Sequence, residues 1–318
     1  MEKRLPRYIS RSLFLEGEGM KRKKRKCDWM LHLMLLPSVI MLFIFSYVPL
    51  TGIIIAFQKF NPAKGLFGSE WTGLDNFRYI FSLPSIWQVL ENTLVLSVLK
   101  IVIGTLVAIA TALLLNECRH RLFKKTVQTI VYFPYFVSWI ILAGIISDIL
   151  SPTKGLVNQL ITALGGESIY FLGDNKYFRG TLIASDVWRN FGYNSIVYLA
   201  AITGIDPTLY EAAALDGAGR WKQMIHVTLP GMSVIIILMV VLNLGNLFNA
   251  GFDQVFNLYS AGVYESGDII DTMVFRLGIQ QGQLAPATVV GLMKSIVSLV
   301  LISLSYYIAD KKFEYKIF

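Results

Sequence analysis

Six apolar runs, each of twenty residues or more, limit the fold of this chain more than any other feature of its sequence. At a helical rise of about 1.5 Å per residue, such a run crosses a bilayer core about 30 Å thick. Backbone groups in lipid must be hydrogen-bonded within their own segment, so each run is expected to be a helix. The runs cover residues 30–57, 88–116, 126–150, 181–203, 232–252 and 286–309. The sequence therefore predicts an all-α polytopic membrane protein with six transmembrane helices.

Composition agrees with a membrane protein. Hydrophobic residues make up 54% of the 318 residues and charged residues only 16%, with a mean hydropathy of +0.55. A soluble domain is less apolar and more charged. The net charge of +8 would suggest nucleic acid in a soluble chain. In a membrane protein the distribution of Lys and Arg matters more than their sum, and no nucleic-acid partner is expected.

The distribution of Lys and Arg predicts the orientation. With the N-terminus inside, the inner segments hold nineteen Lys and Arg residues and the outer loops seven. Both termini are therefore expected in the cytoplasm of a multi-pass protein of the cell membrane. Residues 1–28 form a basic cytoplasmic segment whose cluster at 21–26 suits anionic lipid headgroups. Residues 29–318 form the transmembrane domain. The first apolar run is not followed by a small-residue cleavage site, so it is expected to stay in the membrane and not to be removed as a signal peptide.

The polar stretch 209–230 separates the fourth and fifth runs on the predicted inner side. Helix-forming residues at 211–214 precede a glycine-containing cluster at 216–219, which is expected to end the helix. A second helical piece then covers 220–228, and Pro230 suits the first turn of the next helix. Asp216 is a candidate cap for that second piece. The stretch predicts helix, glycine turn and helix, a shape that fits a cleft on another protein.

This stretch resembles the EAA coupling loop of ABC-transporter permeases. The positions in register with the family pattern are Glu211, Ala212, Ala213, Gly217, Leu229 and Pro230. Val227 and Ser233 depart from it, where many members carry Ile and a further Pro. The resemblance implies that Glu211 pairs with a basic group of an ATPase subunit and that Gly217 permits the turn. It implies close packing for the two alanines and makes Asp216 a further candidate for partner contact.

Other segments narrow the resemblance. Residues 73–81, 91–98 and 133–145 resemble signatures of maltose-type sugar permeases, and the tail 309–318 resembles the subgroup that handles aldouronate- or alginate-like oligosaccharides. The resemblance implies the type I ABC importer permease fold and carbohydrate import without enzyme activity. It also implies a second homologous permease, two ATP-binding subunits and an extracytoplasmic solute-binding protein, docked at outer loops 58–87 and 151–180. The chain has no P-loop, so it needs no cofactor itself, and ATP and Mg belong to the partner ATPase.

Three amides are candidates for the translocation path. Asn243, Asn246 and Asn249 recur every three residues, which places them near one helix face. Amides in lipid are costly unless they face a partner or a watery cavity, and they suit sugar hydroxyls. The same spacing fits hydrogen bonds between helices, since glycines nearby favour close helix contact. Both interpretations remain open at this point.

Cations inside the runs are costly against lipid. Lys100, near mid-span, is expected to pair with an acid of a partner subunit or with an acidic substrate. Arg189 and Lys294 lie nearer the outer surface, where long side chains reach water. Aromatics and amides at 188–194, including Tyr193 and Asn194, form a candidate sugar surface. The three histidines have no metal-ligand spacing, so no metal site is expected.

Rival classes fit the sequence less well. A secondary transporter carries ion-coupling acids in broken helices and shows inverted repeats, and the runs show no such repeat. A membrane-embedded enzyme needs a catalytic constellation, which is not evident. An ABC importer of a non-sugar solute stays an alternative. The sequence does not identify the sugar.

Overall fold

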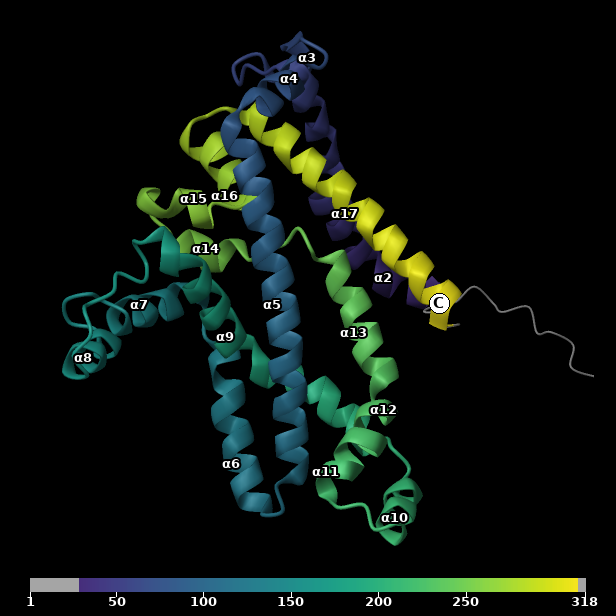
Figure 1. Ribbon diagram of the computed structural model, residues 1–318. Helices are drawn as coiled ribbons and strands as arrows, with labels where there is room; N and C mark the ends of the chain where they lie inside the picture. Colours follow the sequence, from purple (N-terminus) through teal and green to yellow (C-terminus); the bar gives the residue numbers. More distant parts are fainter. Residues whose placement is uncertain (1–28, 314–318) are drawn as a thin grey trace, which may run out of the picture. The chain divides into compact units, whose positions relative to one another are not determined.

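The computed structural model describes residues 29–313 and divides the chain into two compact units, residues 1–51 and 52–318. Figure 1 shows its helices along the chain. The predicted basic segment 1–28 and the last residues of the tail lie outside the described residues.

The first unit holds the start of one continuous helical segment. It contains α2 (Trp29–Leu42), the π-helical turn η1 (Phe43–Tyr47) and the beginning of the 3-10 helix η2 (Val48–Phe57), which continues into the second unit. The 26 residues His32–Phe57 are long and apolar enough to cross a membrane. The first predicted span is thus helical throughout its described length.

The second unit is helical apart from one short ribbon, in which β1 (Gln58–Lys59) and β2 (Glu70–Trp71) pair antiparallel. Its helices are α3 (Gly65–Gly68), α4 (Asp75–Ser82), α5 (Pro84–Glu117), α6 (Arg121–Tyr132), η3 (Phe133–Phe136), α7 (Trp139–Ile149), α8 (Leu156–Ala163), α9 (Asn175–Thr203), α10 (Pro207–Leu215), α11 (Arg220–Gln223), η4 (Met224–Thr228), α12 (Leu229–Gly231), α13 (Ser233–Gly245), α14 (Phe252–Leu258), η5 (Ala261–Val263), α15 (Tyr264–Gly267), α16 (Ile270–Phe275), η6 (Arg276–Gln280) and α17 (Leu284–Phe313).

The observed helices match the predicted runs in position but not all in form. Among the described residues, three helices are long and apolar enough to span a membrane, or up to five if each of two bent pairs is one span. The helix α9, with 29 residues, is long enough but carries too many polar residues to be counted with them. The all-α prediction is confirmed, and the number of six spans stays a prediction.

The third predicted span, 126–150, is not one helix. The chain bends by 105° between its two parts, α6 with η3 and then α7. Pro134 lacks the N–H that a continuing helix needs. Val137 and Ser138 then adopt extended backbone conformations, and the Ser138 hydroxyl accepts a 3.5 Å hydrogen bond from the amide of Ile141 at the start of α7. The break follows from local sequence and is stabilised from α9, as described below.

The fifth predicted span, 232–252, also ends early. The helix α13 stops at Gly245, and the chain turns through residues 246–251 before α14 begins. Gly251 has a φ of +90°, a conformation that favours glycine. This turn brings backbone and amide groups of residues 246–251 next to α5 and α9, where a regular helix would otherwise continue.

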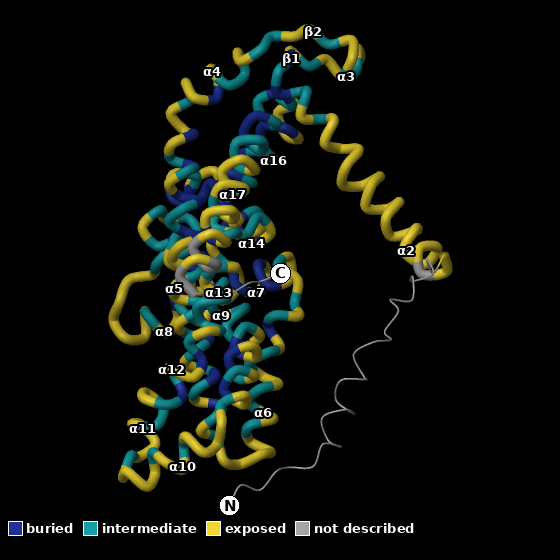
Figure 2. The backbone as a smooth tube through the Cα atoms, turned by 90° about the vertical axis from the view of Figure 1, so that its right-hand side faces the viewer, coloured by how far each residue is buried: buried dark blue, intermediate teal, exposed yellow. Residues whose placement is uncertain are grey.

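Packing in the second unit centres on α5 and α9 (Figure 1). Small residues of α5, Ala108 and Ala112, pack with Tyr198 and Ile202 of α9, so the two helices approach closely. Figures 1 and 2 both place α10 and α11 at the same end of this unit as the turn between α5 and α6. That end carries the candidate coupling segment, and the turn after α13 lies well away from it.

A candidate coupling elbow and a polar cavity between helices

Residues 207–231, here called the coupling elbow, consist of two helical arms joined by a glycine turn. Its first arm, α10, begins with Asp206 as cap: the carboxylate accepts a 2.9 Å hydrogen bond from the amide of Thr208. That backbone hydrogen bond lowers the pKa of Asp206. The arm ends at Asp216, and Gly217 has a φ of +75° that favours glycine. The predicted helix, glycine turn and helix are confirmed.

The expectation that Asp216 caps the second arm is wrong. The cap residue of α11 is Gly219, and Asp216 instead ends α10. The turn is completed by the amide of Ala218, which donates to the carbonyl of Ala213 at 2.9 Å. Asp216 is exposed at the corner of the elbow.

The second arm contains a π-helical turn that explains how it runs past Pro230. In an α-helix, a proline at 230 loses its bond to the carbonyl of His226 and its ring clashes with that carbonyl. Here η4 widens the helix at Met224–Thr228, and the amide of Leu229 bonds to the carbonyl of Met224. Pro230 therefore lies in the short helix α12, ahead of α13, close to its predicted place.

Side-chain contacts join the two arms. The Tyr210 hydroxyl and the Thr228 hydroxyl lie 3.0 Å apart, and Gln223 donates to the carbonyl of Ala218 at 3.0 Å. A Cβ atom on Gly231 would lie 2.7 Å from Ile205, so the last residue of the elbow touches the chain just before its first. The elbow is therefore one packed body.

The outer surface of the elbow combines an acid with apolar side chains. Glu211 is exposed and has no hydrogen bond or ion pair among the described residues. Leu215 is 90% exposed and Trp221 is 70% exposed. Figure 2 shows the exposure along α10 and α11. Large apolar side chains beside an exposed acid on a polar segment make this surface a candidate for contact with another protein.

A polar cavity of about 180 Å³ lies between α5, α9 and the turn after α13. Its lining residues are Ser97, Lys100, Ile101, Asp186, Asn243, Asn246, Asn249, Ala250 and Gly251. The three predicted amides and Lys100 thus meet at one site. The prediction that the three amides share one helix face is wrong, because only Asn243 of the three belongs to α13. The other two amides reach the cavity from the turn that follows it.

Two polar residues that line this cavity, Ser97 and Asp186, were not predicted from the sequence. Asp186 of α9 lines it, and a carboxylate inside an apolar run was a signal that the sequence offered. Ser97 is 2% exposed, and its hydroxyl has no hydrogen-bond partner in the described part of the chain. A buried polar atom without a partner is costly, so the cavity has unmet hydrogen-bonding capacity.

Lys100 is bound within its own chain. Its ammonium donates to the carbonyl of Ala250 at 2.7 Å and to the side-chain oxygen of Gln254 at 2.5 Å. Gln254 in turn donates to the carbonyl of Leu182 at 2.7 Å and to the Ser185 hydroxyl at 2.8 Å. Two of the three ammonium donors are thereby used. The charge is stabilised by these oxygens, and the expected pairing with an acid of a partner subunit or an acidic substrate stays a prediction.

Arg189 lies at the break between α6 and α7. It donates to the carbonyls of Tyr135 at 3.0 Å and Val137 at 3.3 Å, and its guanidinium stands over the rings of Tyr135 and Trp139. The Tyr193 ring stacks on Tyr135 with centroids 3.8 Å apart. The break frees carbonyls that a continuous helix would satisfy, and Arg189 supplies their donors. Arg189, Tyr193 and Asn194 are not among the residues that line the polar cavity.

Further ion pairs hold α16. Lys294 of α17 donates to Asp271 at 2.5 Å, and Arg276 pairs with Asp268. Burial opposes the Arg276 charge, but the hydrogen bond and charge of Asp268 outweigh it and raise the pKa of Arg276. Burial, with Tyr264 alongside, raises the pKa of Tyr259 to about 12. Lys294 is thus paired within the chain rather than extended to the surface.

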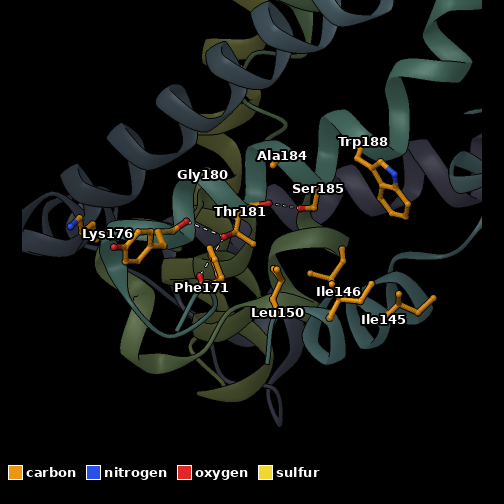
Figure 3. Close-up of a pocket in the computed structure, with 12 residues that line it drawn as sticks. Ile145, Ile146, Leu150, Phe171, Lys176, Gly180, Thr181, Ala184, Ser185 and Trp188 are labelled. Carbon is orange, nitrogen blue, oxygen red and sulfur yellow. Dashed lines mark hydrogen bonds between the residues drawn. The ribbon is translucent and has the colours of Figure 1, made fainter. Parts of the chain in front are cut away.

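A larger cavity of about 490 Å³ lies between α7 and α9 and is shown in Figure 3. Ile145, Ile146 and Leu150 form one side, and Trp188 stands at one end. The Thr181 and Ser185 hydroxyls donate to backbone carbonyls of α9. Apart from Lys176 and Tyr177, the lining of this cavity is apolar or has its hydroxyls bonded. The smaller cavity gathers three amides, Asp186, Lys100 and the Ser97 hydroxyl, so it is the better candidate for a hydroxylated ligand. Within residues 29–313, no three His, Cys, Asp or Glu side chains gather as for a metal ion.

Comparisons with known proteins agree on one family. A family model described as binding-protein-dependent transport system inner membrane component matches residues 100–314. The polygalacturonan/rhamnogalacturonan transport system permease protein YteP of Bacillus subtilis (strain 168) is 45% identical over 281 residues, 88% of each chain. Protein LplB of the same strain is 40% identical over 308 residues, 96% of this chain and 97% of LplB.

Solved structures agree as well. A chain of a bacterial ABC transporter involved in the import of the acidic polysaccharide alginate superposes with a TM-score of 0.83 and 38% identity, over 90% of this chain and 96% of that one. A chain of a bacterial alginate ABC transporter in complex with an alginate pentasaccharide-bound periplasmic protein superposes with a TM-score of 0.82 and 37% identity, over 89% of this chain and 95% of that one.

Proposed function

This chain belongs to the family of binding-protein-dependent transport system inner membrane components, and we propose that it forms one half of the translocation path of an ATP-driven oligosaccharide importer. The family, the type I ABC importer permease fold and the multi-pass membrane character expected from the sequence are confirmed. Family members are transport permeases, in agreement with the expectation of no enzyme activity. The observation that carries the proposal is the coupling elbow, with exposed apolar side chains and an acid, Glu211, that is unpaired in the described part of the chain.

The proposed cargo is an acidic oligosaccharide. Two of the relatives have a named cargo: polygalacturonan/rhamnogalacturonan for YteP and the acidic polysaccharide alginate for the solved transporter. In this chain Asn243, Asn246 and Asn249 offer amides for hydroxyl groups, and Lys100 has one N–H donor left. Arg189, Tyr193 and Asn194 stay candidates for a separate contact along the path. A non-sugar solute is the alternative cargo.

The proposed assembly contains a second homologous permease, two ATP-binding subunits and an extracytoplasmic solute-binding protein. One solved relative is in complex with a periplasmic protein, which supports the last of these. Asn246 and Asn249 are exposed, so the polar cavity needs another chain to enclose a cargo. ATP and Mg bind to the ATPase subunits. Both termini are proposed to be cytoplasmic, and loops 58–87 and 151–180 face the binding protein.

The elbow residues have distinct proposed roles. Glu211 pairs with a basic group of the ATPase, with Asp216 beside it at the exposed corner. The small side chains of Ala212 and Ala213 allow the ATPase to pack closely against the elbow, where larger side chains would clash. Gly217 supplies the turn. Leu229 and Pro230 join the elbow to α13 through the wide helical turn. Domain movement of the ATPase would then tilt α9 and α13 together.

The test is co-purification of the ATPase with this permease. Glu211→Lys reverses the charge at the proposed contact and is expected to abolish the association. Glu167→Lys makes the same change at an exposed position of the predicted outer loop and serves as the matched control. An intact complex with Glu211→Lys would contradict the coupling proposal.

A further inference from the structure

The coupling elbow also contacts a helix to which it is not joined in sequence. Arg220, the first residue of α11, lies 3.5 Å from the carboxylate of Glu117, the last residue of α5. Their side chains are 54% and 41% exposed. The chain itself links the elbow only to α9 and α13, so this ion pair adds a connection to a third helix.

The helix α5 is built to carry a displacement along its length. It runs without a break for 34 residues, and its proline is at the first position, where a missing N–H costs little. From Glu117 to Lys100 the helix spans about 26 Å at 1.5 Å per residue. Ser97 and Lys100 line the polar cavity. A movement at Glu117 therefore reaches the cavity wall.

Arg220 moves with the elbow rather than independently of it. It begins the second arm, which is tied to the first by the contact between Tyr210 and Thr228. Gln223, in the same short helix, bonds back to the glycine turn. A shift of α10 is thus transmitted to Arg220.

We propose that the Glu117–Arg220 ion pair is a second mechanical connection, which carries the movement of the elbow directly into α5 and so to the polar cavity. This inference rests on the proposed function of the elbow. It assigns both residues a positioning role, because neither touches the cavity.

An exposed ion pair is a modest and salt-sensitive interaction. Breaking it is expected to lower the cargo transported per ATP hydrolysed about two- to fivefold, and fivefold corresponds to about 1 kcal/mol. The effect belongs to coupling, so ATPase association and the rate of ATP hydrolysis without cargo should change little.

The experiment is a charge swap in the complete transporter, reconstituted in vesicles with its binding protein. Glu117→Arg and Arg220→Glu each place like charges together and should lower transport per ATP. The double variant restores opposite charges and should return to within about twofold of the wild type. Raising salt from 50 to 500 mM should lower the wild-type ratio toward that of the single variants. Lys125→Glu, a charge reversal at an exposed residue of α6 that has no ion pair among the described residues, is the matched control.

Two results would overturn the inference: single variants that couple normally, or a double variant no better than the worse single one. Loss of the ATPase from Arg220→Glu, unrepaired in the double variant, would assign Arg220 to the ATPase contact instead. These outcomes are distinct from failure of the proposed function, which is tested separately by whether the ATPase co-purifies with the Glu211→Lys variant.

Discussion

Lys100 of α5 donates a 2.7 Å hydrogen bond to the backbone carbonyl of Ala250, in the turn that follows the end of α13. A turn packed between helices leaves backbone oxygens without helical partners, and the buried Lys100 ammonium satisfies one of them. Through Gln254, the same ammonium is connected to α9. Lys100 therefore fixes the turn that presents Asn246 and Asn249 to the polar cavity.

The first prediction concerns this attachment. Lys100→Met keeps the length of the side chain but leaves Ala250 and Gln254 without their donor. Each lost hydrogen bond between helices is worth about 1–2 kcal/mol, so the purified complex should melt at a lower temperature. Uptake should fall roughly tenfold as the amides lose their positions. Leu99→Met, at the exposed neighbouring position of α5, should behave as the wild type, and normal uptake by Lys100→Met would count against the attachment.

The amides of the cavity are tested by Asn246→Leu. If they line the path, uptake should fall about tenfold while the second permease and the ATPase still co-purify. If they bind neighbouring helices instead, assembly itself should be lost. Asn257→Leu is a suitable control, because among the described residues the Asn257 amide bonds to the carbonyl of Asp253 in the same helix, and Asn257 does not line the cavity.

Arg189 gives a prediction about the break between α6 and α7. Arg189→Gln removes the donors for Tyr135 and Val137 and the contacts with two rings, at a cost of about 1–3 kcal/mol. Thermal unfolding of the purified protein should report the loss. Arg189→Lys should rescue little, since an ammonium cannot span both carbonyls as the guanidinium does.

Tyr193→Phe is the control at this site, because it retains the stacked ring on Tyr135. It should melt within about a degree of the wild type. An Arg189→Gln protein with unchanged melting but a higher KM for cargo would return Arg189 to the candidate cargo contacts.

Local features of the sequence predicted the elbow well. The glycine at 217 and the helix-forming residues before it act within a few positions, so the helix, turn and second helix could be inferred without long-range contacts. Asp216 was assigned to the wrong helix because aspartate favours helix starts, whereas here the first arm ends at Asp216 and the second begins three residues later, with Gly219 as its cap. The family pattern supplied the role of the elbow, which its geometry alone does not.

Long-range relationships were not accessible in the same way. The cost of a charge in lipid identified Lys100 as unusual, but its oxygen partners lie 150 and 154 residues away. The apolar runs 126–150 and 232–252 were long enough for single helices, yet Pro134 and the turn before Gly251 divide them. Hydropathy averages over such breaks, whereas backbone geometry depends on individual residues.

The wide turn η4 carries one residue more than an α-helical turn needs. Deleting a single residue between 224 and 228 would remove this widening, rotate everything before it by about 100° relative to Pro230 and bring the proline ring against the carbonyl four residues earlier, which kinks the helix. Glu211 would then face another direction although every side chain of its own arm was unchanged. The angular setting of the docking face is thus encoded in a helical irregularity more than ten residues downstream of it.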